Sequence, residues 1–169
     1  EYEDLSVNIF LNRFSVAKVK VEQEQFAGTI EEVKLKGLSY FKILFGDEVE
    51  IDELELLSPE IRFFASDTSS EKSASQRKVQ INEFRIKNGI FSKQSSDTTA
   101  NSIYARVTSA EVSDLQPEMQ VSDIKSYDIK LDSIFLKMNA EHYIDVGSLA
   151  AEDGKVNISD FKIRSFYPR

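Results

Sequence analysis

Apolar and polar residues recur along this chain in a block of eight, in which apolar side chains occupy the first, third, sixth and eighth positions. The clearest copy reads Val49-Glu-Ile-Asp-Glu-Leu-Glu-Leu56, and three further clear copies begin at Val79, Ile129 and Val156. Weaker copies begin at residues 14, 28 and 105. Successive copies start about 24 residues apart on average, a spacing typical of stacked supersecondary units.

Each block is predicted to be a long β-strand with one apolar face. The first and third positions share one face of a strand, and so do the sixth and eighth, but the parity slips by one residue between the two pairs. A β-bulge at the slip would absorb the extra residue and keep all four apolar side chains on one side. A helix is excluded because this spacing scatters the apolar groups around the helical wheel. In the clear copies the slip falls at Asp52-Glu53, Asn82-Glu83, Asp132-Ser133 and Ser159-Asp160.

The bulge predicts which side chains are shielded from solvent. In one block the shielded residues should be Val49, Ile51, Leu54 and Leu56, with Glu50 and Glu55 exposed. In the last block they should be Val156, Ile158, Phe161 and Ile163, with Asn157 and Lys162 exposed. If the two pairs of a block face opposite sides instead, the strand crosses between two packed sheets of a closed sandwich.

Turn signals divide the chain into one long antiparallel meander. Ser58-Pro59 ends a strand at 49–57, because proline cannot donate a hydrogen bond in a central ladder. Lys87-Asn88-Gly89 indicates a turn, and Asp153-Gly154 is the strongest hairpin signal in the chain. We therefore expect a mainly β fold, an elongated and curled antiparallel meander of bulged strands.

Two kinds of segment depart from the strand pattern. Residues 39–45 are predicted to form one short helix, because they lack a β-branched run and are followed by Gly46, a typical residue after a helix end. The polar segments 66–76 and 95–102 are predicted to be mobile loops. Residues 1–169 are expected to form a single β-rich domain. The chain does not begin with Met, so we expect it to be a fragment of a longer protein.

The composition excludes several classes of function. The 169 residues include no cysteine and one histidine, His142, so thiol catalysis and a metal site with two histidines are excluded. Acidic residues outnumber basic ones 29 to 21, and the net charge of −8 repels phosphate backbones. The Gly-x-Ser-x-Gly elbow, glycine-rich phosphate loops and calcium-loop spacings are all missing. We expect no enzyme activity, cofactor, metal or nucleic-acid partner, and His142 is expected to be an ordinary residue on a strand surface.

The apolar face of the strands is the remaining candidate site. Such a face must be covered by helices, by a second sheet or by the curled sheet itself. An open trough lined with Val, Ile, Leu and Phe would suit acyl chains, whereas a closed dry core would bind no ligand. Both possibilities remain open at this point. The candidate lining residues are Val49, Ile51, Leu54, Leu56, Val79, Ile81, Phe84, Ile86, Ile129, Leu131, Ile134 and Leu136.

Part of the chain resembles the AsmA/TamB-like proteins of the bacterial envelope. The run Gly37-Leu38-Ser39 to Phe45-Gly46 is similar to the short helical stretch of that family, and the strand from Val49 to Leu56 with Pro59-Glu-Ile61 is similar to the strand that follows it. The later blocks, each followed by a return strand, are similar to the repeats of that superfamily. No site residue can be carried over, because the family's groove is defined by pattern and not by residue identity.

The resemblance implies a location and a function. It implies a long curled β-sheet with an apolar groove in the periplasm, held to the membrane by an N-terminal segment that this sequence does not contain. It also implies a part in lipid transport, with lipid and other envelope proteins as the expected partners. The alternative is a structural or protein-interaction β-sandwich that has a closed core and no ligand.

Overall fold

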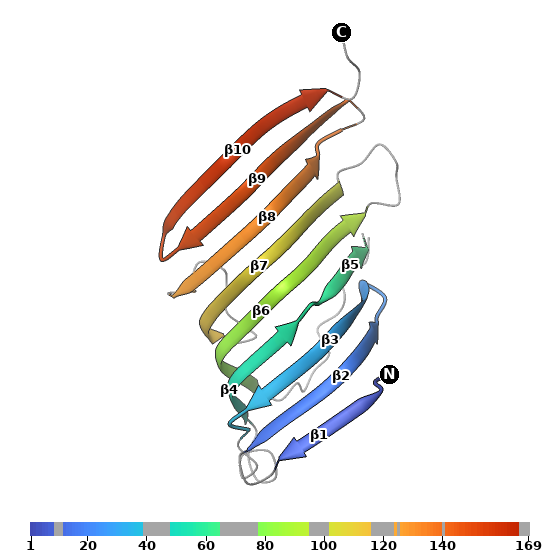
Figure 1. Cartoon of the computed structure of the whole chain (residues 1–169), viewed down its shortest axis with the longest axis vertical. Helices are drawn as coiled ribbons and strands as arrows, with labels where there is room; N and C mark the ends of the chain where they lie inside the picture. The colour runs from blue at the N-terminus through green and yellow to red at the C-terminus, as the bar shows by residue number, and fades with distance from the viewer. Residues whose placement is uncertain are drawn as a thin grey trace.

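The computed structural model of this chain is a single twisted and bent β-sheet (Figure 1). The structure describes residues 1–8, 12–38, 48–64, 78–94, 102–115, 124, 126–139 and 141–165. These residues contain no helix, which confirms the predicted mainly β class. The ten strands are β1 (Asp4–Asn8), β2 (Arg13–Glu22), β3 (Phe26–Lys36), β4 (Glu48–Leu57), β5 (Glu60–Phe64), β6 (Lys78–Gln94), β7 (Ser102–Leu115), β8 (Tyr127–Lys137), β9 (His142–Glu152) and β10 (Lys155–Ser165).

The sheet is mixed, whereas the sequence predicted an antiparallel meander throughout. Its strand order is β1-β2-β3-β4-β6-β7-β8-β9-β10, and β5 continues the line of β4 between β3 and β6. Both β4 and β5 pair with β6 in parallel, while all other neighbours are antiparallel. The prediction was wrong at this place because Ser58-Pro59 does not reverse the chain. β6 begins beside the first residue of β4, where Lys78 pairs with Glu48, so β4, β5 and β6 all run in the same direction.

Ser58 and Pro59 interrupt one long strand without turning it. Ser58 has a left-handed backbone (φ 47°), and Pro59 is fully buried between β3 and β6. In β6, Asn88 also has a left-handed backbone (φ 55°), and this strand continues from Lys78 to Gln94. The turn predicted at Lys87-Asn88-Gly89 is therefore wrong, because the same residue types bend this strand and do not close a hairpin.

A line of unpaired positions crosses the sheet and bends it. In β2 and β3, for example, Ala17 pairs with Glu32 and Val19 with Ile30, while the position between them is omitted on both strands. The strands that run in the direction of β2 each have one left-handed residue on this line, with φ between 47° and 66°. These left-handed residues are Lys18, Ser58, Asn88, Ser133 and Asp160.

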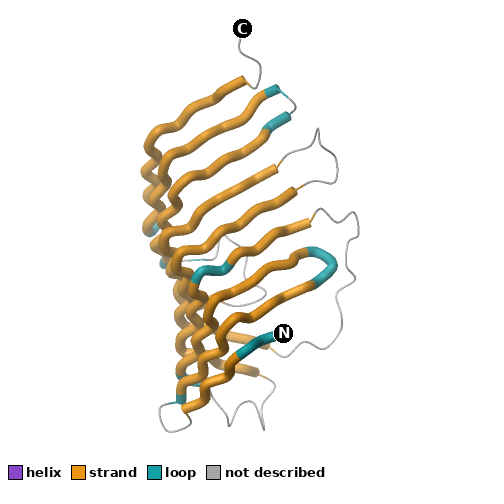
Figure 2. Tube along the Cα trace, turned by 45° about the vertical axis from the view of Figure 1, so that its right-hand side comes forward, coloured by secondary structure: helices purple, strands orange, loops and turns teal. Residues whose placement is uncertain are grey.

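A second and shorter line of unpaired positions crosses β4, β6 and β7. It passes through Asp52, Asn82 and Asp114. The Asn82 side chain donates a hydrogen bond to Asp52 across it, with Nδ2 and Oδ1 3.3 Å apart. In all four clear blocks, the unpaired residue belongs to the pair at which the sequence predicted the slip. Figure 2 shows the result, a single layer that is bent along one side into a trough.

The slips differ from the predicted bulges in one respect. A bulge places an extra residue on one strand of a pair, which shifts the register. Here neighbouring strands omit a position at the same level, so the register between β2 and β3 and between β6 and β7 is the same on both sides of the bend. True register shifts occur between β7 and β8, beside Thr108 and Ser133. The bend is therefore a feature of the whole sheet.

The remaining predictions about connections have mixed outcomes. The Asp153-Gly154 hairpin between β9 and β10 is confirmed, and both turn residues have positive φ, as a two-residue hairpin turn requires. The helix predicted at 39–45 and the loop predicted at 66–76 lie outside the described residues. The loop at 95–102 also lies outside them, except for Ser102, which begins β7.

No second layer covers the sheet within the described ranges. The strands that contact one another there are the hydrogen-bonded neighbours, and no more distant strands touch. The described residues therefore form no sandwich. Few apolar side chains are fully shielded; in addition to Pro59, those with an exposed fraction of 9% or less are Ile30, Ile51, Val107 and Val146.

Candidate functional site

The parallel pairing of β4 with β6 brings two of the apolar blocks side by side. Residues 30 positions apart lie opposite each other, so every apolar position of one block meets the matching position of the other. The four apolar pairs on β4 and β6 are Val49–Val79, Ile51–Ile81, Leu54–Phe84 and Leu56–Ile86. We call the trough face the side of the sheet to which Leu54–Phe84 and Leu56–Ile86 belong, opposite the ion-paired side chains of Glu53, Glu55 and Arg85.

The trough face continues from β6 to β10. Ile86 pairs with Ala110 of β7, Ala110 with Ile129 of β8, and Ile129 with Ala151 of β9. The next row joins Val107, Leu131, Leu149 and Ile158, and the row after it joins Ala105, Ile134, Val146 and Phe161. The candidate residues on β8 therefore belong to the same surface as those on β4 and β6, although β7 separates the two groups.

The geometry at Gly89 shows that the apolar residues stay on one face across the bend. A side chain added at Gly89 would meet Phe91 (2.8 Å), Ile86 (3.0 Å) and Pro59 (3.1 Å). Ile86 and Phe91 lie on opposite sides of the unpaired residue Asn88 in the sequence, yet both point to the side that Gly89 faces. Their side chains converge there, so the trough face is the concave side of this bend.

The exposure of the twelve candidate residues agrees with an open face and not with a closed core. Ile51 is buried at 9% exposure, and the other eleven are half-buried. In the Val49 block, Ile51 is buried as predicted, whereas Val49, Leu54 and Leu56 are only half-buried, as is Glu50, which the sequence predicted to be exposed. The prediction for the last block was wrong, because β10 is an edge strand, and its apolar residues Val156, Ile158, Phe161 and Ile163 are exposed.

The sequence predicted an exposed Glu55, and the structure contradicts this as well. Glu55 is 6% exposed, because two lysines cover it on the outer, convex face of the sheet. Its Oε2 atom lies 2.6 Å from Nζ of Lys87, and its Oε1 atom lies 3.6 Å from Nζ of Lys34. The hydrogen bond from Lys87 lowers the pKa of Glu55, and the charge of Lys87 and then that of Lys34 lower it further.

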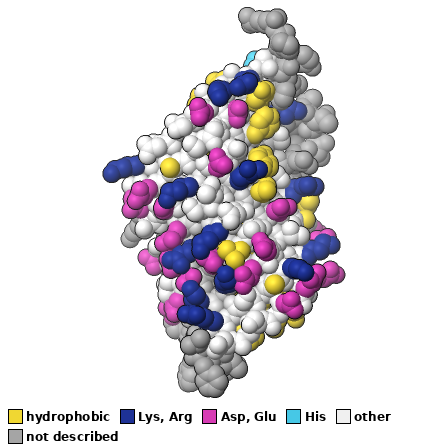
Figure 3. All heavy atoms as spheres, in the orientation of Figure 1, with side chains coloured by type: hydrophobic (Ala, Val, Ile, Leu, Met, Phe, Trp, Pro, Cys, Tyr) yellow, Lys and Arg dark blue, Asp and Glu magenta, His cyan; other side chains and the backbone are white. Residues whose placement is uncertain are grey.

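Charged side chains of both signs are scattered over the face seen in Figure 3, and ion pairs join many of those on β3, β4, β6 and β7. Arg85 lies at their centre: its Nη1 is 3.1 Å from Oε1 of Glu53, its Nε is 3.1 Å from Oε2 of Glu111, and it also pairs with Glu83. Burial raises the pKa of Glu83, and the neighbouring carboxylate of Glu111 adds to this shift. Positive and negative groups alternate across neighbouring strands, which makes this face a solvated surface and leaves the trough face as the apolar one.

Several residues of the trough face were not among the predicted candidates. They come from β5 and β9, which the sequence analysis treated as return strands, and from β7, whose block is weak. β9 carries the same spacing, with Ile144, Val146, Leu149 and Ala151 at the four apolar positions and Gly147 unpaired, so the block signal was present in the sequence but was not recognised. The missed residues include Ile61, Phe63, Val107, Ile144, Val146 and Leu149.

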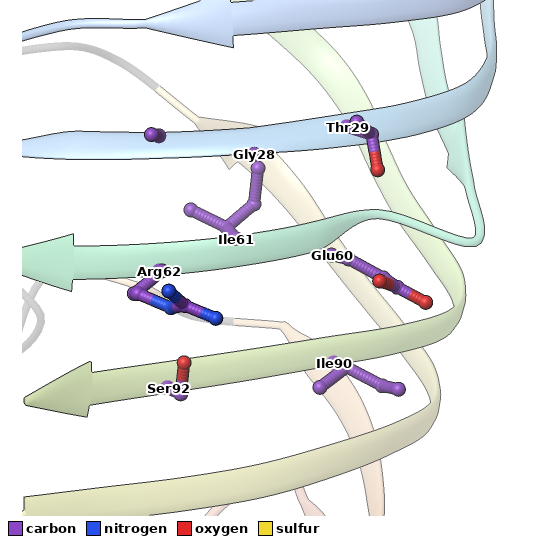
Figure 4. Close-up of a pocket in the computed structure, with 8 residues that line it drawn as sticks. Gly28, Thr29, Glu60, Ile61, Arg62, Ile90 and Ser92 are labelled. Atoms are coloured by element: carbon purple, nitrogen blue, oxygen red, sulfur yellow. The ribbon is translucent and has the colours of Figure 1, made fainter.

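A recess of about 320 Å³ lies where β5 replaces β4 beside β3 (Figure 4). Its lining residues come from β3, β5 and β6 and include Gly28, Glu60, Arg62 and Ile90. Known small-molecule sites range from about 300 to 1,000 Å³ and have convergent polar groups. The recess is at the lower end of that range. The extended trough face is the stronger candidate site.

The described residues offer few other groups that could take part in catalysis or bind a metal ion. His142 is exposed at the start of β9, as expected, and its backbone N–H donates a hydrogen bond to Oδ1 of Asn139 (2.7 Å). Within the same ranges, no three His, Cys, Asp or Glu residues are grouped so that they could hold a metal ion. The described part of the chain also has no helix with the length and apolar character that crossing a bilayer requires.

The comparisons with known proteins assign no function to the trough face. No protein-family model matches this chain, and a search of curated proteins finds no match to it.

Proposed function

We propose that this chain is a non-enzymatic β-domain of the bacterial envelope that holds lipid acyl chains along its trough face. The observation that carries the proposal is the continuous row of half-buried apolar side chains on the concave side of a sheet that has one layer in its described part. The proposal agrees with what the resemblance to AsmA/TamB-like proteins implies. The periplasmic location and the anchoring segment belong to the same proposal.

The dimensions of the trough face suit an acyl chain. Nine strands lie side by side along the trough, and at about 4.8 Å per strand they span about 38 Å. One leaflet of a bilayer core is about 15 Å thick, so an acyl chain of that length fits along the trough with room for a second. An apolar chain needs no hydrogen-bond partners, and the alternating Val, Ile, Leu and Phe side chains offer none.

The test compares three variants in a binding titration with a fluorescent fatty acid such as cis-parinaric acid. Leu54→Asp and Phe84→Asp place a charge on the trough face and are expected to weaken binding at least about tenfold, or about 1.4 kcal/mol. Leu57→Asp is the matched control, because Leu57 lies on the same strand but points to the outer face. We expect it to bind like the unmodified chain.

The alternative function, a closed structural or protein-interaction module without a ligand, predicts a different outcome. Leu54 and Phe84 would then belong to a dry core, and an aspartate at either position would unfold the domain by burying an unpaired charge. Circular dichroism of the three variants separates the two functions. Folded variants with normal spectra and no saturable binding by the unmodified chain would overturn the proposal.

A further inference from the structure

The trough face carries a charged residue, Lys93, near the end of β6. The rows of paired residues that cross this face from β6 to β9 start at Phe84, Ile86, Gly89, Phe91 and Lys93. Apart from Lys93, every described residue of these rows is apolar, a glycine or a tyrosine. Successive residues of a strand point to opposite faces, and Gly89 faces the trough, so Phe91 and Lys93 face it as well. The place of Lys93 on the apolar side thus follows from the course of the strand.

Lys93 lies on an exposed rim of the trough face. β5 and β6 end, and β7 begins, along the same side of the sheet (Figure 1). There Lys93 is exposed and pairs with Phe63 of β5 and Ile103 of β7, whose side chains are 40% and 43% exposed. Two rows further in, Val107 of β7 is 7% exposed. The trough face is therefore accessible at this rim and shielded near the bend.

The ammonium group of Lys93 has no carboxylate partner among the described residues. Its neighbours across the strands, Phe63 and Ile103, are both apolar. On the outer face, in contrast, Lys36 pairs with Glu53, and Lys87 pairs with Glu55. The aliphatic stem of a lysine can lie along apolar neighbours while its ammonium group stays in water. The charge of Lys93 is thus available to an anion that does not belong to these strands.

An amphiphile with an anionic head group matches this arrangement. From Lys93 to Gly89 the strand spans about 13 Å, at about 3.3 Å per residue. With its head group at Lys93, an acyl chain would pass over Phe91 and reach the shielded part of the trough at the bend. Carboxylates and phosphates both accept charge-assisted hydrogen bonds from a lysine ammonium group, whereas an uncharged head group gains no such bond.

We propose that Lys93 binds the anionic head group, a carboxylate or a phosphate, of an amphiphile whose acyl chain lies on the trough face. This inference rests on the proposed function, because Lys93 has no such role without a bound acyl chain. It adds a preference for a negatively charged head group. It also assigns the head group to the rim at which β5 and β6 end.

The test compares cis-parinaric acid, fully ionised, with its uncharged methyl ester in binding titrations. Lys93→Gln is expected to weaken binding of the acid about two- to fivefold, the range for an exposed ion pair, and to leave binding of the ester unchanged. Lys93→Glu should weaken binding of the acid further, because it repels the carboxylate. Lys130→Gln is the matched control: it removes one positive charge from the outer face, where Lys130 pairs with Asp128 at 3.0 Å. We expect it to bind both ligands like the unmodified chain.

A second titration, in which lysophosphatidic acid displaces cis-parinaric acid, examines a phosphate head group on a single acyl chain. Weaker binding to Lys93→Gln of the fatty acid, of the phosphate ester or of both supports the inference and identifies the head group. If neither anionic ligand depends on Lys93, or if the acid and its methyl ester lose equally, the inference is wrong and the proposed function stands. An equal loss of acid binding in Lys130→Gln would also contradict the role of Lys93. If the unmodified chain binds neither the acid nor the ester, the proposed function fails, and this inference fails with it.

Discussion

Replacing Gly28 by alanine is expected to lower the free energy of unfolding by about 3 kcal/mol, the upper range for inserting an atom into a packed site. The added Cβ would lie 2.1 Å from the carbonyl oxygen of Glu60 and 3.0 Å from Cα of Ile61. Both are backbone atoms of β5, so the clash can be relieved only by separating β5 from β3. For a domain of this size, the melting temperature should fall by about 6–12 °C.

Gly154→Asn is the control for this substitution. A Cβ at Gly154 meets no atom within 4 Å, and its φ of +82° is a conformation that asparagine tolerates better than other residues. We expect a change of less than about 1 kcal/mol. If the Gly28→Ala variant has the same melting temperature as the unmodified chain, β3 and β5 are not held at this distance.

Replacing Val107 by aspartate is expected to abolish cooperative folding. Val107 is 7% exposed and lies at the bend, paired with Gly89 of β6 and Leu131 of β8. An unpaired carboxylate at such a position costs several kcal/mol, and a domain is stable by only about 5–15 kcal/mol in total. Few side chains in the described sheet are as well shielded, so the loss cannot be spread over a larger core.

Two further variants keep this prediction measurable. Val107→Thr preserves the shape and adds one hydroxyl, and it should cost about 1–2 kcal/mol in urea denaturation. Leu54→Asp should cost no more than that, because Leu54 is half-exposed and its carboxylate can reach solvent. If Leu54→Asp unfolds the chain as completely as Val107→Asp, the trough face is a closed core.

The positions of the strands and their slips could be predicted from the sequence because both depend on local alternation. Asp52, Asn82, Ser133 and Asp160 are the residues at which the alternation fails, and they are also the residues that the sheet leaves unpaired. The parallel pairing of β4 with β6 could not be predicted in this way. It depends on where a long connection leads, and no residue near Pro59 carries that information.

The burial of Glu55 and the bend at Asn88-Gly89 are two other features that could not be predicted from the sequence. A glutamate flanked by leucines alternates as a solvent-facing residue should, but two lysines from neighbouring strands shield it once the register is set. Asn-Gly favours positive φ, which a hairpin turn and a bend within a strand both require. Local residue preference cannot choose between them, because the choice is made by the strands on either side.

Photocross-linking tests most directly whether acyl chains lie on the trough face. A photoreactive benzoyl-phenylalanine replaces Phe84 on the trough face, or Phe135 on the outer face as the matched position. Phe135 follows Ile134 in β8 and therefore points away from the trough, where its ring lies 5.0 Å from that of Tyr143. After irradiation in bacterial cells, mass spectrometry is expected to find acyl-lipid adducts at position 84 and none at position 135. Lipid adducts at neither position, or equal amounts at both, would contradict the proposed function.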